Sequence, residues 1–169
     1  MLIETRTAVA SDAIAICKVV RRSISECCVL DHRNDPATLS AWLGNKTPES
    51  ALAWVQSPDS VAIVAAQGDR VVGFALATGD ELALCYALPE VLHTGFGKAL
   101  LQAIEPRVIS QGIRTLRVVS TRTAQSFYSR NGFSMSGPPQ VWAGLEGLPM
   151  EKALKATPLS AERSAIATL

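Results

Sequence analysis

The sequence predicts one mixed α/β domain in which most strands are antiparallel and one pair is parallel. Two apolar runs, 61–66 and 71–78, flank the turn sequence QGDR, which is typical of a hairpin. A third strand over 82–88 is followed by an amphipathic helix over 96–110 and a β-branched strand over 115–120. Such a strand–helix–strand unit pairs its two strands in parallel through a right-handed crossover.

The remaining elements extend this sheet and add helices. The run from Leu2 to Val9 predicts a first strand. Three helices are expected where a polar residue or a proline precedes apolar residues at three-to-four spacing, at Ser11-Asp12, Asp35-Pro36 and Pro48. The C-terminal part predicts a helix over 123–130 and strands over 133–136 and 148–154. We expect a single domain over 1–154 and a C-terminal tail over 155–169.

The composition narrows the class of protein. A chain of 169 residues with 48% hydrophobic residues can bury a substantial core, and no run approaches the roughly 18 apolar residues of a membrane span. The first residues, MLIETRTAVASD, lack the basic start and apolar block of a signal peptide. A formal net charge of +1 gives no electrostatic case for a nucleic-acid partner. We therefore expect a cytoplasmic protein without a membrane partner.

The cysteines and histidines do not predict a metal site. Four cysteines and two histidines occur, without a C-x-x-C pair. Cys27-Cys28 lie shortly before Asp31-His32, so a nucleophilic role for one of these cysteines is a weaker alternative.

The glycines of Gly95-Phe96-Gly97 mark the junction between a loop and a helix. The first turn of a helix has N–H groups without internal partners and a partial positive charge, so it suits a phosphate group. Glycines allow close approach to the backbone, although a tight turn without a ligand would have the same sequence. Phe96 forms a stripe with Leu100 and Ile104, which predicts that its ring is in the core.

Two motifs resemble those of the GNAT superfamily of N-acetyltransferases. The segment LCYALPEVLHTGFGKALL is similar to the acetyl-CoA segment of that family, and AQSFYSRNGF is similar to its A-x-x-F-Y-x-x-x-G-F motif. The resemblance implies the GNAT fold, a central mixed and mostly antiparallel twisted sheet with helices on both faces and a splayed parallel strand pair at the cofactor site. It also implies transfer of an acetyl group from acetyl-CoA to a primary amine by direct attack in a ternary complex.

The resemblance also implies roles for single residues. The pantetheine arm would pair with the backbone of three residues of the predicted strand, Cys85, Tyr86 and Ala87. Backbone amides would hold the pyrophosphate, at His93, Thr94, Gly95, Phe96, Gly97 and Lys98. Tyr128 would protonate the departing CoA thiolate. Thr121 stands where the family often has an asparagine and would bond pantetheine, while Leu92 replaces the usual Gln or Arg and leaves phosphate binding to the backbone.

The sequence offers candidates for the base that deprotonates the amine and for the residues of the acceptor pocket. Glu81 lies 95 − 81 = 14 residues before Gly95, a spacing similar to that of the catalytic glutamate in histone-type members; the alternatives are a solvated carboxylate at the start of a strand, or a base that acts through a water chain. Asp31 and His32 follow the first helix, on the side where the family builds its acceptor pocket, and His32 is a second candidate base. Trp142 is a further candidate for the acceptor site. Each of these three residues has a structural alternative, as a polar loop pair or as packing.

Two other functions compete with catalysis. A GNAT fold that binds CoA or a protein partner without turnover has the same motifs. A dinucleotide-binding domain is excluded, because the glycines follow antiparallel strands and the third glycine is missing. The acceptor, a small molecule or a protein amine, is not identified by the sequence, and the sequence leaves a homodimer open.

Overall fold

The computed structural model describes residues 2–155, and residues 156–169 of the predicted tail lie outside this part. An eight-stranded sheet forms the centre, in the order β1-β2-β3-β4-β5-β8-β6, with β7 paired to β8. Its strands are β1 (Glu4–Thr7), β2 (Ser60–Gln67), β3 (Arg70–Thr78), β4 (Glu81–Ala87), β5 (Thr115–Ser120), β6 (Ser134–Met135), β7 (Gln140–Trp142) and β8 (Leu145–Ala153). All described pairs are antiparallel except β4 with β5. The predicted mixed, mostly antiparallel sheet is confirmed.

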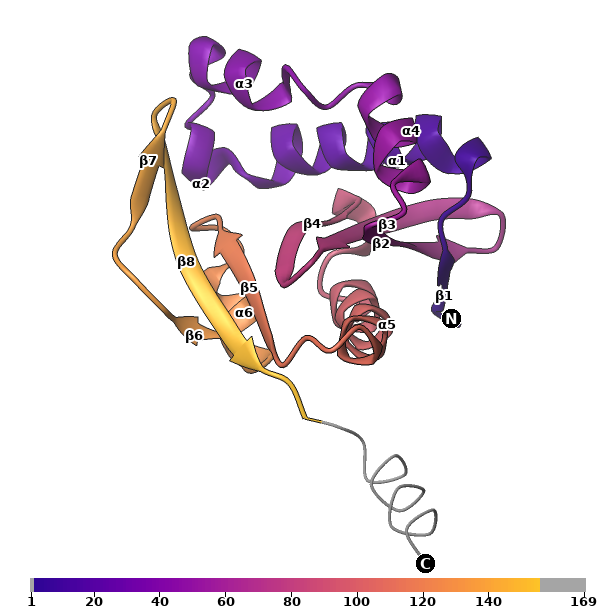
Figure 1. Cartoon of the computed structure of the whole chain (residues 1–169). Helices are drawn as coiled ribbons and strands as arrows, with labels where there is room; N and C mark the ends of the chain where they lie inside the picture. Colours follow the sequence, from indigo (N-terminus) through magenta and orange to yellow (C-terminus); the bar gives the residue numbers. More distant parts are fainter. Residues whose placement is uncertain (1, 156–169) are drawn as a thin grey trace, which may run out of the picture.

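Helices cover both faces of the sheet, as expected (Figure 1). One face carries α1 (Ala13–Arg22), α2 (Val29–His32), α3 (Pro36–Leu43) and α4 (Pro48–Gln56). The other face carries α5 (Phe96–Ser110) and α6 (Gln125–Arg130). Short 3-10 turns, Ala10–Asp12 and Pro89–Val91, precede α1 and follow β4.

Capping side chains stabilise the predicted starts of α3 and α4. The Asp35 carboxylate accepts a hydrogen bond from the Thr38 N–H at 2.9 Å, and the Thr47 hydroxyl accepts one from the Ser50 N–H at 3.1 Å. Each satisfies an N–H group that has no partner within the helix. Prolines at the first helical positions, which need no N–H donor there, start both α3 and α4.

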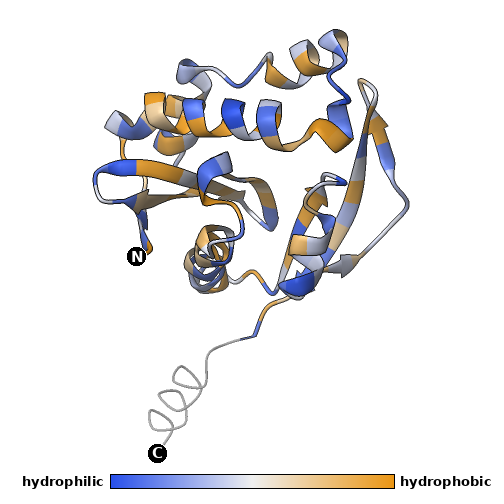
Figure 2. Ribbon diagram, turned by 180° about the vertical axis from the view of Figure 1, so that it is seen from behind, coloured by the Kyte–Doolittle hydropathy of each residue, from blue (hydrophilic) through white to orange (hydrophobic). Residues whose placement is uncertain are grey.

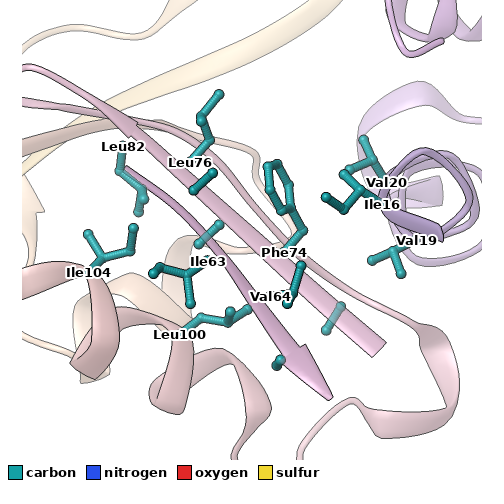
Figure 3. Close-up of a cluster of buried hydrophobic side chains, with 14 of the residues drawn as sticks. Ile16, Val19, Val20, Ile63, Val64, Phe74, Leu76, Leu82, Leu100 and Ile104 are labelled. Carbon is teal, nitrogen blue, oxygen red and sulfur yellow. The ribbon is translucent and has the colours of Figure 1, made fainter. Parts of the chain in front are cut away.

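The core has two parts, one on each face of β2 and β3. Toward α1, Phe74 packs with Ile16 and Val20 and stacks on Trp54 with ring centroids 5.9 Å apart. Toward α5, the fully buried side chains of Ile63, Leu100 and Ile104 meet (Figure 3). Figure 2 shows the same pattern as apolar residues concentrated on the central strands and on the inward faces of the helices. Strands buried on both faces read as continuous apolar runs, and β2 and β3 do.

The parallel strands β4 and β5 separate soon after they meet. Within residues 2–155, their register contains a single pair, Glu81 with Arg117. Asp80 fixes this end, because its carbonyl oxygen accepts from the Arg117 N–H at 2.8 Å and its carboxylate from the guanidinium at 2.6 Å. Farther along β4, the register with β3 shifts at Ala83, and such a bulge bends a strand. The expected splayed pair is therefore present.

The sequence did not predict two features that border this opening. The first helix continues past α1 as a π-helix, Ser23–Cys27, and then as α2. The last strand begins at Leu145 rather than 148 and forms a hairpin with β7, which was not expected. π-Helical turns occur frequently at functional sites.

Candidate functional site

A cavity of about 620 Å³ occupies the opening between β4 and β5. Its walls come from the π-helix, from β4, from the turn before α5, from the end of β5 and from α6. The cavity therefore joins the two predicted motifs, 84–101 and 124–133, which are distant in the sequence. Its size is that of a pocket for a small ligand.

The edge of β4 that faces the cavity has free backbone groups. Leu88 donates its N–H to the Val72 oxygen on β3. Because neighbouring residues of a strand point their N–H groups to opposite sides, those of Ala87 and Cys85 point away from β3, toward the cavity. No β5 residue of the described chain pairs with them. The predicted residues Cys85, Tyr86 and Ala87 all line the cavity, and the strand offers hydrogen bonds that an extended ligand can complete.

The start of α5 presents N–H groups to the same cavity. The first helical bond runs from the Ala99 N–H to the Gly95 oxygen at 3.0 Å, which leaves the N–H groups of 96–98 without a partner inside the helix. His93, Gly95, Gly97 and Lys98 line the cavity. Gly95 has a φ of 94°, a conformation that favours glycine. The N–H of Thr94 bonds the Val91 oxygen at 3.3 Å. The Phe96 N–H belongs to the free groups, while its side chain is in the core, as its stripe predicted.

Gly97 lies against an aromatic ring of α6, where a side chain would have no room. A Cβ at Gly97 would lie 2.9 Å from an edge carbon of the Phe127 ring on α6. A side chain there would displace that ring from the cavity wall. Nearby, the Thr121 hydroxyl accepts from the Ala124 N–H at 3.0 Å and so holds the turn that leads into α6. Thr121 lines the cavity as predicted, and its hydroxyl proton stays available for another acceptor.

Tyr128 is buried at the wall of the cavity, with 5% of its surface exposed. Its ring packs edge-on against Phe127 and Phe133, at centroid distances of 5.2 and 5.3 Å. The phenol lies beside the Cys85 thiol. Burial, followed by the neighbouring Cys85 and Tyr86, raises the pKa of Tyr128 well above its usual value. The phenol is therefore protonated at neutral pH and lies next to a sulfur atom.

Glu81 lies at the closed end of the opening. It starts β4 and directly precedes Leu82, the first β4 residue that lines the cavity. Its side chain is exposed and makes no hydrogen bond or ion pair with the rest of residues 2–155. Glu81 itself does not line the cavity, so a proton from the cavity would reach it through water.

Asp31 and His32 lie behind the cavity wall rather than in it. The Asp31 carboxylate accepts from the Arg122 N–H at 2.7 Å and from the Thr123 hydroxyl at 2.5 Å, which fastens α2 to the loop after β5. His32 is 1% exposed. Its Nδ1 accepts from the Asn34 N–H, so Nε2 carries the proton and donates to the Ile24 oxygen at 3.0 Å. Both ring nitrogens are used by the fold, and neither residue lines the cavity.

Trp142 is also outside the cavity. It is 60% exposed on β7, opposite Leu145 of the hairpin. The hairpin contacts α3 through the Thr38 hydroxyl, which donates to the Ala143 oxygen at 3.1 Å. The predicted acceptor residues are therefore not brought together by the structure.

Other residues form the cavity wall on the side of α1 and α2. Ser23 and Cys27 line it from the π-helix, Cys28 lines it from the residue that follows, and Val119 lines it from β5. Trp42 of α3 lies next to Tyr86. From the sequence, Cys27-Cys28 suggested only a nucleophile and not a part of this wall. Burial raises the pKa of Cys27, and it raises that of Cys28 to about 12, which disfavours a thiolate nucleophile.

Two further structural findings apply to residues 2–155. No group of three or more His, Cys, Asp or Glu side chains in this range is placed to hold a metal ion. In the same range, every helix is too short or too polar to cross a membrane.

Comparison with known proteins gives the family. The Acetyltransferase (GNAT) domain model matches residues 32–154. An amino-acid acetyltransferase of Pseudomonas fluorescens is 43% identical over 68 residues, which are 40% of this chain and 16% of that relative's length. A GCN5-related N-acetyltransferase from Rhodopseudomonas palustris has a similar fold, with a TM-score of 0.79 and 21% identity over 91% of this chain and 99% of the other.

A second solved structure has the same fold. The PaiA N-acetyltransferase of Thermoplasma acidophilum, solved in complex with coenzyme A, gives a TM-score of 0.75 and 24% identity over 90% of this chain and 99% of the other. At these identities the two structures establish the fold alone, whereas the domain model covers most of the chain. The chain therefore belongs to the GNAT superfamily of acetyltransferases.

Proposed function

We propose that this protein is an N-acetyltransferase that moves the acetyl group of acetyl-CoA to a primary amine by direct attack in a ternary complex. The observation that carries the proposal is the Tyr128 phenol, which is protonated, is buried at the cavity wall and lies beside the Cys85 thiol. A CoA thiolate that leaves at the same wall would accept the phenolic proton.

The residues of the cavity fit acetyl-CoA. The free N–H groups of Cys85 and Ala87 suit the amide-bearing pantetheine arm, and the first-turn N–H groups of α5 suit the pyrophosphate. Gly97 keeps the approach open, and Lys98 and Arg130 add positive charge to the cavity wall. The complex of the Thermoplasma acidophilum protein with coenzyme A supports this choice of ligand.

The chain's own groups supply what amide formation needs. Acetyl-CoA, when bound, brings an activated acyl thioester. Of the two free β4 N–H groups, the one beside the thioester would stabilise the oxyanion that develops on its carbonyl oxygen, while the other holds the pantetheine arm. Tyr128 would give its phenolic proton to the departing sulfur. The amine must lose a proton, and Glu81 is the candidate base, through a water molecule because its carboxylate lies outside the cavity.

A variant tests the assignment of the base. Glu81→Gln keeps the size of an exposed side chain, so we expect the melting temperature to stay unchanged. If Glu81 is the base, kcat at pH 7 falls by about tenfold or more, and the loss shrinks as the pH rises toward the pKa of the amine, where less deprotonation is needed. An unchanged pH profile of kcat/KM would show that the amine enters already neutral.

The acceptor and the setting are further parts of the proposal. The name of the Pseudomonas relatives, amino-acid acetyltransferase, supports an amine as the acceptor. We place the protein in the cytoplasm, where its thiols stay reduced, and a homodimer remains compatible with the fold.

A binding module on the same fold is the competing function. Titration calorimetry with acetyl-CoA, together with an assay of CoA release over a panel of primary amines, separates the two. We expect micromolar binding and release that depends on the amine. Binding without release for every amine would favour the module, and no binding of acetyl-CoA would contradict both.

A further inference from the structure

Side chains along β4 point alternately to the two faces of the sheet, and this alternation identifies the side of the cavity that would hold the acceptor amine. Cys85 points toward α5 and α6, where Tyr128 lies beside its thiol. Tyr86 and Leu84 therefore point to the opposite face, and their register partners, Phe74 and Leu76, agree, since Phe74 packs toward α1. An amine that attacks from the side opposite the CoA sulfur would lie against Leu84 and Tyr86.

The wall across from these residues is uncharged. It consists of Ser23 and Cys27 from the π-helix, of Cys28 just after it and of Val119 from β5. Tyr86 lies next to Trp42, and burial raises the pKa of Tyr86, so its phenol stays neutral. The pKa of both cysteines is raised as well, which keeps the thiols protonated at neutral pH.

The charges of the cavity wall are all of one sign. Lys98 and Arg130 lie on the CoA side, and no Asp or Glu among residues 2–155 lines the cavity. Of the acids close to the acceptor side, two are already bound: Asp31 accepts from Arg122 and Thr123, and Glu26 pairs with Arg22 at 2.8 Å. Glu81 has no such partner but lies outside the cavity, where it would take up the proton of the reacting amine through water. A buried ammonium without a carboxylate is costly. One ammonium can lose its proton as the reaction requires, but a second one finds no carboxylate on the cavity wall formed by residues 2–155.

From this distribution we infer that the acceptor is a monoamine on an uncharged, apolar body, and that polyamines and aminoglycoside-like polycations are excluded. The inference rests on the proposed function and names the class of its substrate. The apolar side chains of Leu84 and Val119 would contact the body of the acceptor. The Tyr86 phenol would be its hydrogen-bond partner.

A matched pair of amines tests the inference on the unaltered protein. Pentylamine and 1,5-diaminopentane have the same chain length and differ by one ammonium. The diamine has two reactive nitrogens, so a site indifferent to charge would favour it. We expect kcat/KM for pentylamine to exceed that for the diamine by about tenfold or more, because the second charge is unpaired.

A pair of variants adds a positive test. Cys27→Asp places a carboxylate on the wall, and Cys27→Asn is its neutral control of nearly equal size. We expect the aspartate variant to raise the ratio of diamine to monoamine turnover severalfold over the asparagine variant. Equal or faster turnover of the diamine by the unaltered protein would overturn the inference and leave the acetyltransferase proposal standing. Equal release of CoA in the absence of any amine would contradict both the inference and the acetyltransferase proposal.

Discussion

Replacement of Tyr128 by phenylalanine tests the catalytic proposal most directly. The ring is held by Phe127 and Phe133 at 5.2 and 5.3 Å, and Tyr128→Phe keeps these contacts. The substitution removes one hydroxyl group that lies beside the Cys85 thiol, and the loss of a single polar contact costs at most about 1 kcal/mol of stability. For a chain of this size that corresponds to a decrease in melting temperature of about 2–4 °C.

The effect on the reaction should be far larger than the effect on stability. A positioned general acid contributes about 10²–10⁴-fold, so we expect kcat to fall by about 100-fold or more. Because the phenol does not bind the phosphates, the Kd for acetyl-CoA should stay within about twofold. Steady-state CoA release and titration calorimetry measure the two quantities.

A packing control separates the acid from the aromatic cluster. Phe133 is 4% exposed, contacts Tyr128 and does not line the cavity. Phe133→Leu should lower the melting temperature more than Tyr128→Phe but reduce kcat only slightly. A decrease in kcat below about threefold for Tyr128→Phe, well short of an acid's usual contribution, would refute the role of the phenol.

Three further predictions concern the loop after β5, the buried thiols and the phosphate turn. Asp31→Asn weakens charge-assisted bonds to Arg122 and Thr123, so thermal melts should show a loss of about 1–3 kcal/mol in the free energy of unfolding; a changed KM for the amine at constant stability would instead place Asp31 in the acceptor site. Burial raises the pKa of Cys28 and of Cys85 to about 12, so the folded state retains protons that the unfolded state loses above about pH 8.5. Stability should therefore be full below that pH and fall by about 1.4 kcal/mol per pH unit for each thiol as the pH rises toward 12. A melting temperature that is flat between pH 8.5 and 10.5 would contradict this. Leu92→Gln places an amide on an exposed loop residue beside the phosphate turn, and one added hydrogen bond should lower the Kd for acetyl-CoA about fivefold, measured by calorimetry; an unchanged Kd would show that backbone groups already saturate the phosphates.

The strand–turn–helix over 82–110 could be predicted because each of its parts has a local cause. Proline ends the strand, glycine allows the positive φ at Gly95, and the stripe of Phe96, Leu100 and Ile104 turns the helix toward the core. The caps at Asp35 and Thr47 are equally local, and both helices start where the sequence placed them.

The acceptor side could not be predicted because its geometry depends on tertiary contacts. The same helical spacing continues through Ser23–Cys27, so nothing in the pattern distinguishes a π-helix from an α-helix there. His32 is exposed or buried according to where α3 packs, and the structure buries it against Trp42 at a centroid distance of 6.3 Å. Asp31 satisfies N–H groups that are 91 and 92 residues away in the sequence. Such partners are visible only after the chain has folded.

The opening between β4 and β5 is braced at both of its ends. Asp80 and Arg117 fix the end where the strands meet, and Asp31 fixes the far end through Arg122 and Thr123. A slot held in this way has a set width before any ligand arrives. The two strands then need no closing movement when acetyl-CoA binds, and little conformational entropy is lost. Acetyl-CoA should therefore associate at a rate limited by diffusion and orientation rather than by a movement of the protein.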